Sequence, residues 1–159
     1  MALVQPVEAG ESSTVRMSPE GLSVHMRIPA ERTYLANATL TLREICDHLC
    51  MQEQRTNRIV LALEEAILNS IEHAYNGSGG LIDLQLSIEG PEFVIVVEDF
   101  GNGMVHEIDI DSLRESELLF DRGRGLCIMK GISDKAIVQS TAGRGTRTTM
   151  LFQISNHED

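Results

Sequence analysis

The 159-residue chain has few cysteines and no long hydrophobic run. No apolar stretch reaches the ~18 residues that a membrane helix needs, so we expect no membrane partner. The first residues, MALVQPVEAGESS, lack the charged start and apolar centre of a signal peptide, which favours a cytoplasmic protein. The cysteines, Cys46, Cys50 and Cys127, form neither a disulfide framework nor a zinc pattern, and we expect buried, reduced thiols.

Positive charge is also scarce, because 13 basic residues stand against 24 acidic ones and the net charge is −11. Proteins that bind nucleic acid normally present a basic face, so nucleic acid is not expected as a partner. Most of the basic residues in the second half of the chain gather near its end: Arg122, Arg124, Lys130, Lys135, Arg144 and Arg147. This cluster indicates either a solvated basic edge or a site for an anionic small molecule.

The pattern of apolar residues predicts one domain at 21–155, preceded by a polar arm at 1–20. Strands are expected at 21–30, 81–88, 93–99, 135–141 and 146–154, and helices at 36–51, 54–75 and 123–133. Strands joined by short turns pair antiparallel, and the helices must cover one face of the sheet. The expected fold is therefore α+β, a two-layer sandwich with a mostly antiparallel mixed sheet.

The predicted helix at 54–75 has one apolar side and one polar side. Its apolar side should pack on the sheet: Ile59, Val60, Leu63, Ala66, Ile67, Ser70, Ile71 and Ala74. Its polar side carries three residues at successive helical turns: Glu65, Asn69 and His73. Glu64 lies about a quarter turn away from this line. The line is either a solvated face or one wall of a cleft, and Leu61 and Leu68 beside it favour a partly covered face. His73 is expected to be a structural hydrogen-bonding residue rather than a catalyst.

Three glycine pairs punctuate the second half of the chain. The first, in VVEDFGNGM, follows a strand that ends on Asp99, and alone it is compatible with a plain hairpin. The second, in DRGRGL, opens a helix, where free N–H groups and the helix dipole favour phosphate. The third, in AGRGT, opens the last strand and is also typical of a hairpin. Neither a third glycine for a dinucleotide fingerprint nor a Gly-Lys-Ser/Thr Walker loop is present.

Taken in order, Glu-x3-Asn-x3-His, Asp-x-Gly-x-Gly, Gly-x-Gly and Gly-x-Gly-Thr resemble the Bergerat-type ATP-binding fold of gyrase, histidine kinases and mismatch-repair ATPases. The resemblance covers residues 21–154 and implies ATP or ADP with Mg²⁺ as cofactors. It implies that Asp99 accepts a hydrogen bond from the adenine amino group, that Gly101 and Gly103 let base and sugar approach the backbone, and that Asn69 binds Mg²⁺. The other nucleotide-binding residues that it implies are His73, Met104, Gly123, Arg124, Gly125, Leu126 and Thr146.

Within this fold the chain looks most like the anti-sigma-factor serine kinases of bacterial partner-switching systems. Its length, the helix LALEEAILNSIEHAY and the ending GRGTRTTMLF carry this closer resemblance. The resemblance implies a catalytic base at Glu65, phosphorylation of a Ser or Thr of an anti-anti-sigma (STAS-type) protein, binding of a sigma factor, and a homodimer in which strand 21–30 lies at the interface or in the core. Arg122 is the expected partner of the γ-phosphate, although Arg124 fits the motif equally well, and 104–122 is expected to form a lid.

Three other functions remain open at this point. A histidine-kinase catalytic domain needs a dimerising helix with an acceptor histidine, for which His48 is the only candidate. A gyrase-type ATPase would use Glu65 to activate water and normally carries a further transducer domain. A non-catalytic module would keep the nucleotide pocket and act only by holding a sigma factor.

Overall fold

The computed structural model describes residues 13–18, 21–75, 79–103, 107–109 and 123–154. The strands are β1 (Ser13–Ser18), β2 (Gly21–Pro29), β3 (Leu81–Glu89), β4 (Glu92–Asp99), β5 (Glu107–Asp109), β6 (Lys135–Thr141) and β7 (Gly145–Gln153). The helices are a 3₁₀ turn η1 (Arg32–Tyr34), α1 (Leu35–His48), α2 (Glu53–Asn69), a π-helical turn η2 (Ser70–Ala74) and α3 (Gly123–Ile132).

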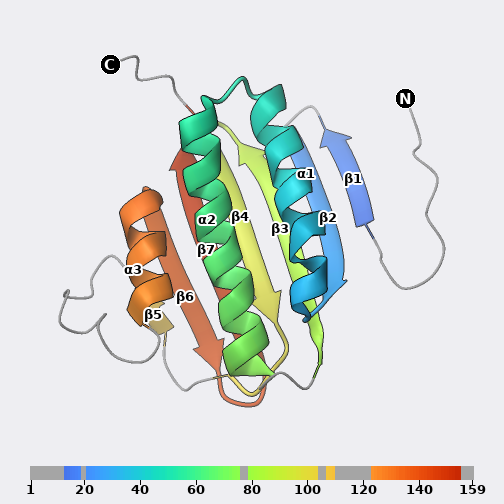
Figure 1. Cartoon of the computed structure of the whole chain (residues 1–159), viewed down its shortest axis with the longest axis vertical. Helices are drawn as coiled ribbons and strands as arrows, with labels where there is room; N and C mark the ends of the chain where they lie inside the picture. Colours follow the sequence, from blue (N-terminus) through green and yellow to red (C-terminus); the bar gives the residue numbers. More distant parts are fainter. Residues whose placement is uncertain (1–12, 19–20, 76–78, 104–106, 110–122, 155–159) are drawn as a thin grey trace.

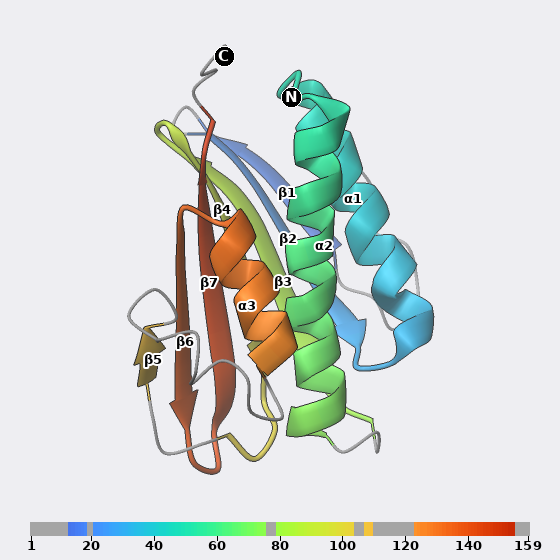
Figure 2. The ribbon, with the colours of Figure 1, turned by 60° about the vertical axis from the view of Figure 1, so that its left-hand side comes forward.

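The described strands form one sheet in the order β1-β2-β3-β4-β7-β6-β5, and neighbouring strands are antiparallel throughout. The three α-helices lie side by side on one face of this sheet (Figure 1). Turned by 60°, the molecule shows two layers, with α1, α2 and α3 on the same side (Figure 2). The predicted two-layer α+β fold is therefore confirmed.

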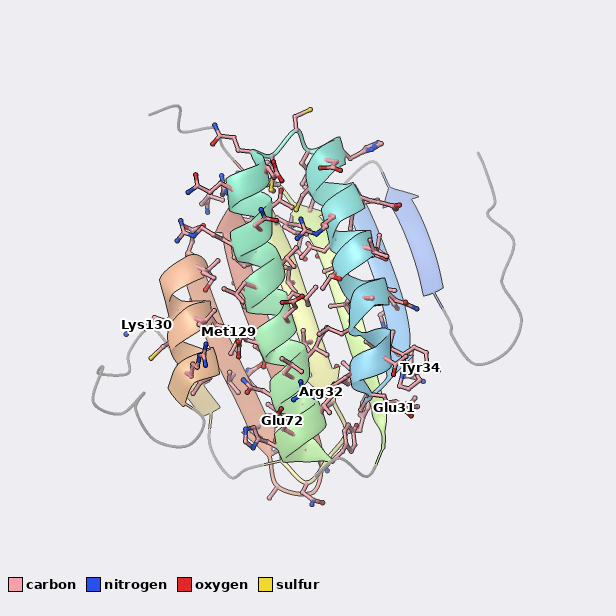
Figure 3. The ribbon with its side chains drawn as sticks, in the orientation of Figure 1. Glu31, Arg32, Tyr34, Glu72, Met129 and Lys130 are labelled. Atoms are coloured by element: carbon pink, nitrogen blue, oxygen red, sulfur yellow. The ribbon has the colours of Figure 1, made fainter. Side chains whose placement is uncertain are left out.

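The core lies between these two layers, as alternation along the strands requires. Ile82, Leu84 and Leu86 alternate along β3 and are fully buried, and α1 and α2 supply the facing layer. The whole predicted apolar side of the long helix is buried, including Ser70 with 6% of its surface exposed. An ion pair between Arg32 of η1 and Glu72 of η2 joins the start of α1 to the end of α2 (Figure 3).

Several boundaries differ from the sequence-based expectation. Part of the predicted polar arm forms β1, which pairs with β2 along its whole length from Ser13↔Met26 to Ser18↔Gly21. Three residues of the predicted lid form β5, which pairs with β6 at the edge of the sheet; positions 104–106 and 110–122 lie outside the described residues. The long helix ends at Asn69, and the chain continues as a π-helical turn. Single π-helical turns are rare, and they frequently occur at functional sites.

The prediction of buried thiols was right for one cysteine and wrong for two. Cys46 faces the core from α1 and is buried, whereas Cys50 and Cys127 are exposed. Cys50 lies just beyond α1 with φ of 53°, the left-handed conformation that commonly ends a helix at the surface. In the part of the chain that the structure describes, no helix is long and apolar enough to cross a membrane.

Candidate functional site

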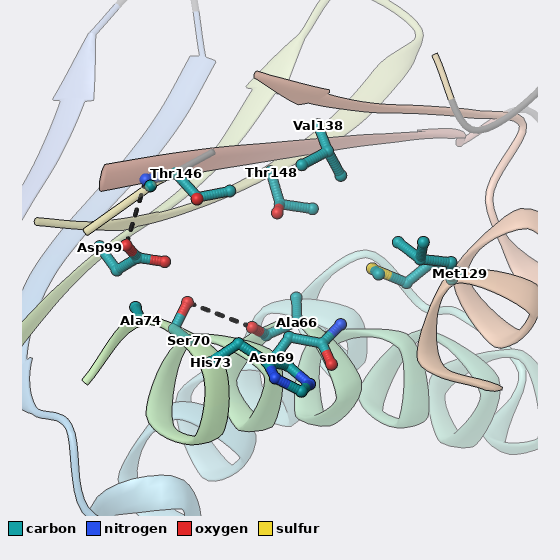
Figure 4. Close-up of a pocket in the computed structure, with 12 residues that line it drawn as sticks. Ala66, Asn69, Ser70, His73, Ala74, Asp99, Met129, Val138, Thr146 and Thr148 are labelled. Atoms are coloured by element: carbon teal, nitrogen blue, oxygen red, sulfur yellow. Dashed lines mark hydrogen bonds between the residues drawn. The ribbon is translucent and has the colours of Figure 1, made fainter. Parts of the chain in front are cut away.

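A pocket opens between the helical layer and one end of the sheet (Figure 4). Its lining residues come from α2 and η2, the end of β4, α3, β6 and β7: Ala66, Asn69, Ser70, His73, Ala74, Asp99, Gly103, Leu126, Met129, Val138, Thr146 and Thr148. Six of these were expected from the sequence: Asn69, His73, Asp99, Gly103, Leu126 and Thr146. Residues that are far apart in the chain, from the long helix and all three glycine pairs, thus meet around one cavity.

Asp99 is the most deeply buried of the polar residues that line this pocket, with 3% of its surface exposed. Its Oδ1 accepts hydrogen bonds from the backbone N–H of Gly101 at 3.2 Å and of Thr146 at 3.1 Å. Both N–H groups reach the same oxygen, which leaves Oδ2 to side-chain or ligand donors. Burial raises the pKa of the Asp99 carboxyl above its ordinary value, although hydrogen bonds from Ser70, Gly101 and Thr146 oppose this rise. The site therefore presents a poorly solvated acceptor held in a fixed orientation.

The glycines around Asp99 allow protein backbone to approach protein backbone. A Cβ at Gly101 would lie 2.4 Å from the carbonyl oxygen of Ala74 in η2. A Cβ at Gly145 would lie 1.9 Å from the carbonyl oxygen of Asp99, and Gly145 has φ of +103°, which disfavours other residues. Gly103, with φ of +59°, packs in the same way against the β6–β7 turn. Whatever room these glycines give a base or sugar, they are first needed to close the chain around the pocket.

The second glycine pair meets the polar line of the long helix. Gly123 begins α3, and a Cβ at Gly125 would lie 3.0 Å from Oε2 of Glu65 and 3.1 Å from Nδ2 of Asn69. The line is therefore partly covered, as predicted; the element that covers it, the first turn of α3, was not predicted. Leu61 beside it remains 41% exposed, whereas Leu68 packs against the core.

Three other predicted site residues are not among the described residues that line the pocket: Arg124, Met104 and Arg122. Arg124 is exposed in the first turn of α3. Met104 and Arg122 lie outside the described residues, so their predicted roles stay predictions.

Six lining residues were not predicted as part of the site: Ala66, Ser70, Ala74, Met129, Val138 and Thr148. The first three were correctly assigned to the sheet-facing side of the long helix, and Met129, Val138 and Thr148 are buried positions of α3, β6 and β7. A periodic pattern finds the inward side of an element but does not tell a packed core from the wall of a cavity. The one signal in the sequence that could have identified these six residues is that they are inward-facing positions close to the glycine pairs.

The oxygen donors in the pocket suit a metal ion that is bound jointly by the protein and a phosphate ligand, rather than by the protein alone. Among the described residues there is no group of three or more His, Cys, Asp and Glu side chains that could hold an ion. Asn69 offers one amide oxygen at the pocket wall. Mg²⁺ prefers oxygen ligands and is usually bound by one or two protein groups together with substrate phosphates. These residues fit Mg²⁺ that arrives with a nucleotide.

The chain matches the family model of the histidine kinase-like ATPase domain over residues 28–152. It is 34% identical over 91 residues to an anti-sigma F factor of Clostridium kluyveri, covering 56% of this chain and 64% of that relative, less than two-thirds of its length. It is 29% identical over 124 residues to an anti-sigma F factor of Clostridium acetobutylicum, covering 77% and 87% of the two chains. It is 25% identical over 131 residues to the serine-protein kinase RsbW of Bacillus velezensis, covering 76% and 79%. The fold, the pocket and the family match agree, and the chain belongs to the histidine kinase-like ATPase domain family.

Proposed function

We propose that the protein is an anti-sigma factor and a serine kinase that binds Mg·ATP and phosphorylates a Ser or Thr of an anti-anti-sigma, STAS-type partner. The names of its relatives, anti-sigma F factor and serine-protein kinase, support both halves of this proposal. The observation that carries the catalytic half is the position of Glu65. Its carboxylate lies beside Asn69 and against the first turn of α3 at Gly125, where a triphosphate would end.

The nucleotide would lie with its base at Asp99 and its phosphates at the start of α3. An amino group on the base would donate to the carboxylate that Gly101 and Thr146 hold in place. The N–H groups of the first turn of α3 would receive the phosphates, as helix starts commonly do. Asn69 would offer its amide oxygen to Mg²⁺, whose charge offsets that of the phosphates when it is bound.

Glu65 would serve the transfer step. The partner's hydroxyl oxygen forms a bond to the γ-phosphorus, the bond from that phosphorus to the bridging oxygen breaks, and ADP leaves. Glu65 would orient the hydroxyl and take its proton. Arg122 would balance charge on the γ-phosphate, with Arg124 as the alternative. Switching between the STAS-type partner and a sigma factor, and a homodimeric state, belong to the same proposal.

The test compares Glu65→Gln with Glu64→Gln, using Mg·ATP and STAS-type partners from the same genome. Both side chains are partly exposed neighbours on α2, but only Glu65 lies on the line with Asn69. General bases typically contribute 10²–10⁴-fold, so Glu65→Gln should lower the phosphorylation rate at least about a hundredfold while ATP binding and partner capture persist. Glu64→Gln should change the rate little.

Four outcomes would change this proposal: two concern the role of Glu65, and two indicate a different function. A loss of only a few-fold in Glu65→Gln would reduce that residue to positioning the hydroxyl, because a loose transition state depends mainly on positioning and electrostatic stabilisation. Equal losses in both variants contradict the proposed geometry. A parent protein that captures a sigma factor and nucleotide but transfers no phosphate to any partner is a non-catalytic binding module, and autophosphorylation on histidine would indicate the histidine-kinase alternative.

A further inference from the structure

Tyr75, which follows the π-helical turn, connects two strands at the edge of the pocket. Its hydroxyl accepts a hydrogen bond from the backbone N–H of Phe100 at 2.7 Å. The same hydroxyl donates to the backbone carbonyl of Leu81 at 2.6 Å. Phe100 directly follows Asp99, and Leu81 begins β3. One side chain thus bonds the backbone beside the proposed base-binding carboxylate.

The position of this hydroxyl in the sheet is specific. The antiparallel register of β3 and β4 pairs Ile82 with Asp99, so the next pair along the ladder would be Leu81 with Phe100. The Tyr75 hydroxyl bridges the N–H and C=O of that next pair. Strands 4.7–4.9 Å apart bond directly, and a bridging oxygen holds the two backbones farther apart. The ladder therefore opens immediately after Asp99.

The aromatic ring of Tyr75 is also held in place, by close packing against Gly80. A Cβ at Gly80 would lie 2.3 Å from Cε1 of Tyr75, so the ring occupies the space that any other residue at position 80 would need. The next residue along the chain, Gly101, packs against the backbone of Ala74, the residue before Tyr75. The chain from Phe100 to Gly101 is thus held by two consecutive residues, Tyr75 and Ala74.

We propose that Tyr75 is a positioning residue for recognition of the base: its hydroxyl keeps the β3–β4 ladder open after Asp99 and so aims the carboxylate into the pocket. This inference rests on the proposed nucleotide binding. Without the hydroxyl, Leu81 and Phe100 can bond to each other directly, which draws Phe100 toward β3 and turns Asp99 with it. We therefore expect a protein without this hydroxyl to fold but to distinguish poorly between adenine and other bases.

The test is Tyr75→Phe, which keeps the ring over Gly80 and removes only the hydroxyl. ADP and IDP are the probes, because the inosine base carries a carbonyl where adenine carries its amino group. The parent should prefer ADP, and Tyr75→Phe should weaken ADP binding about tenfold, IDP binding much less, and so reduce the preference. Tyr34→Phe is the matched control, because the hydroxyl of this second tyrosine bonds to none of the described residues; its affinities should equal those of the parent.

A second measurement needs no variant and applies even if Tyr75→Phe does not fold. Amide hydrogen exchange in the nucleotide-free parent should show protection at Phe100, because Tyr75 bonds its N–H without any ligand. A parent that binds no ADP refutes the proposed nucleotide binding itself. If the parent prefers ADP, two results would overturn the role of Tyr75 alone. One is a Phe100 amide that is not protected in the parent. The other is a Tyr75→Phe variant that keeps the full preference for ADP or binds both ligands equally more weakly.

Discussion

Replacing Asp99 with asparagine should exchange base preference while it leaves the shape of the pocket intact. The new amide oxygen can still accept from the N–H groups of Gly101 and Thr146, which both bond Oδ1 in the parent. The amide NH₂ then replaces Oδ2, so a donor faces the adenine amino donor. A buried polar group left unpaired costs ~1–3 kcal/mol, which corresponds to a loss of about tenfold to a hundredfold in ADP affinity.

The same substitution should improve the match to IDP, because the inosine carbonyl accepts from the new NH₂. Titration calorimetry of ADP and IDP with both proteins gives four dissociation constants. The ratio of the two affinities should move toward IDP by at least about tenfold in Asp99→Asn. A folded variant with unchanged ADP affinity would refute a role for Asp99 in binding the base and would return DFGNG to a simple turn.

Stability should change in the opposite direction to ADP affinity. Burial holds the folded-state pKa of Asp99 above its unfolded-state value. The contribution of such a group to stability is present in acid and is lost as the pH rises from the unfolded-state pKa through the folded-state pKa. Above that range the ionised carboxylate weakens the empty protein, and asparagine removes this effect. Thermal unfolding without nucleotide should therefore show Asp99→Asn at or above the parent near pH 7, with the difference shrinking toward pH 4; a difference that grows in acid would contradict the direction of the shift.

Asn69→Ala should abolish the Mg²⁺-dependent part of nucleotide binding while metal-free nucleotide still binds weakly, and calorimetry that shows the same Mg²⁺ dependence as the parent would exclude Asn69 as a ligand. Gly145→Ala should lower the free energy of unfolding by at least ~2 kcal/mol, because the new Cβ meets the carbonyl of Asp99 at 1.9 Å and φ is +103°. Gly131→Ala is its control: outside its chain neighbours and the nearby backbone of α3, no atom lies within 4 Å of that Cβ, so urea unfolding should show a change within about 1 kcal/mol, toward greater stability. Equal effects at the two glycines would show that the close backbone approach does not limit stability.

The sequence predicted the elements that have a strong internal period. The apolar side of the long helix, now α2 and η2, was predicted correctly because eight inward positions repeat along it, and the strands β3, β4, β6 and β7 were predicted to within one residue at either end. It missed β1, since a six-residue, serine-flanked segment acquires its structure by pairing with β2. It missed the π-helical turn, because spacings of three and four residues look alike in α and π geometry.

Half of the lining of the candidate site was also predictable, and most of its apolar wall was not. Asp99 stood out because a carboxylate ends a buried strand shortly before a glycine pair, and Asn69 because it lies between Glu65 and His73 on the polar side of the long helix. Met129 and Val138 looked like ordinary core residues, and only the end of the sheet at which they lie makes them part of a pocket. The role of Tyr75 depends on a register between two strands, which a single sequence does not contain.

The glycines that crowd backbone against backbone also affect how such chains are identified by motif. Gly101, Gly103 and Gly145 are required where the chain touches itself, at Ala74, at the β6–β7 turn and at Asp99. A descendant that lost its nucleotide altogether would still need them in order to fold. A search for the glycine pattern therefore finds all chains with this fold, including chains that have lost the activity. Under the proposed function, Glu65 and Asn69 act on phosphate transfer and Mg²⁺, so these two positions, rather than the glycines, should separate active enzymes from inactive relatives.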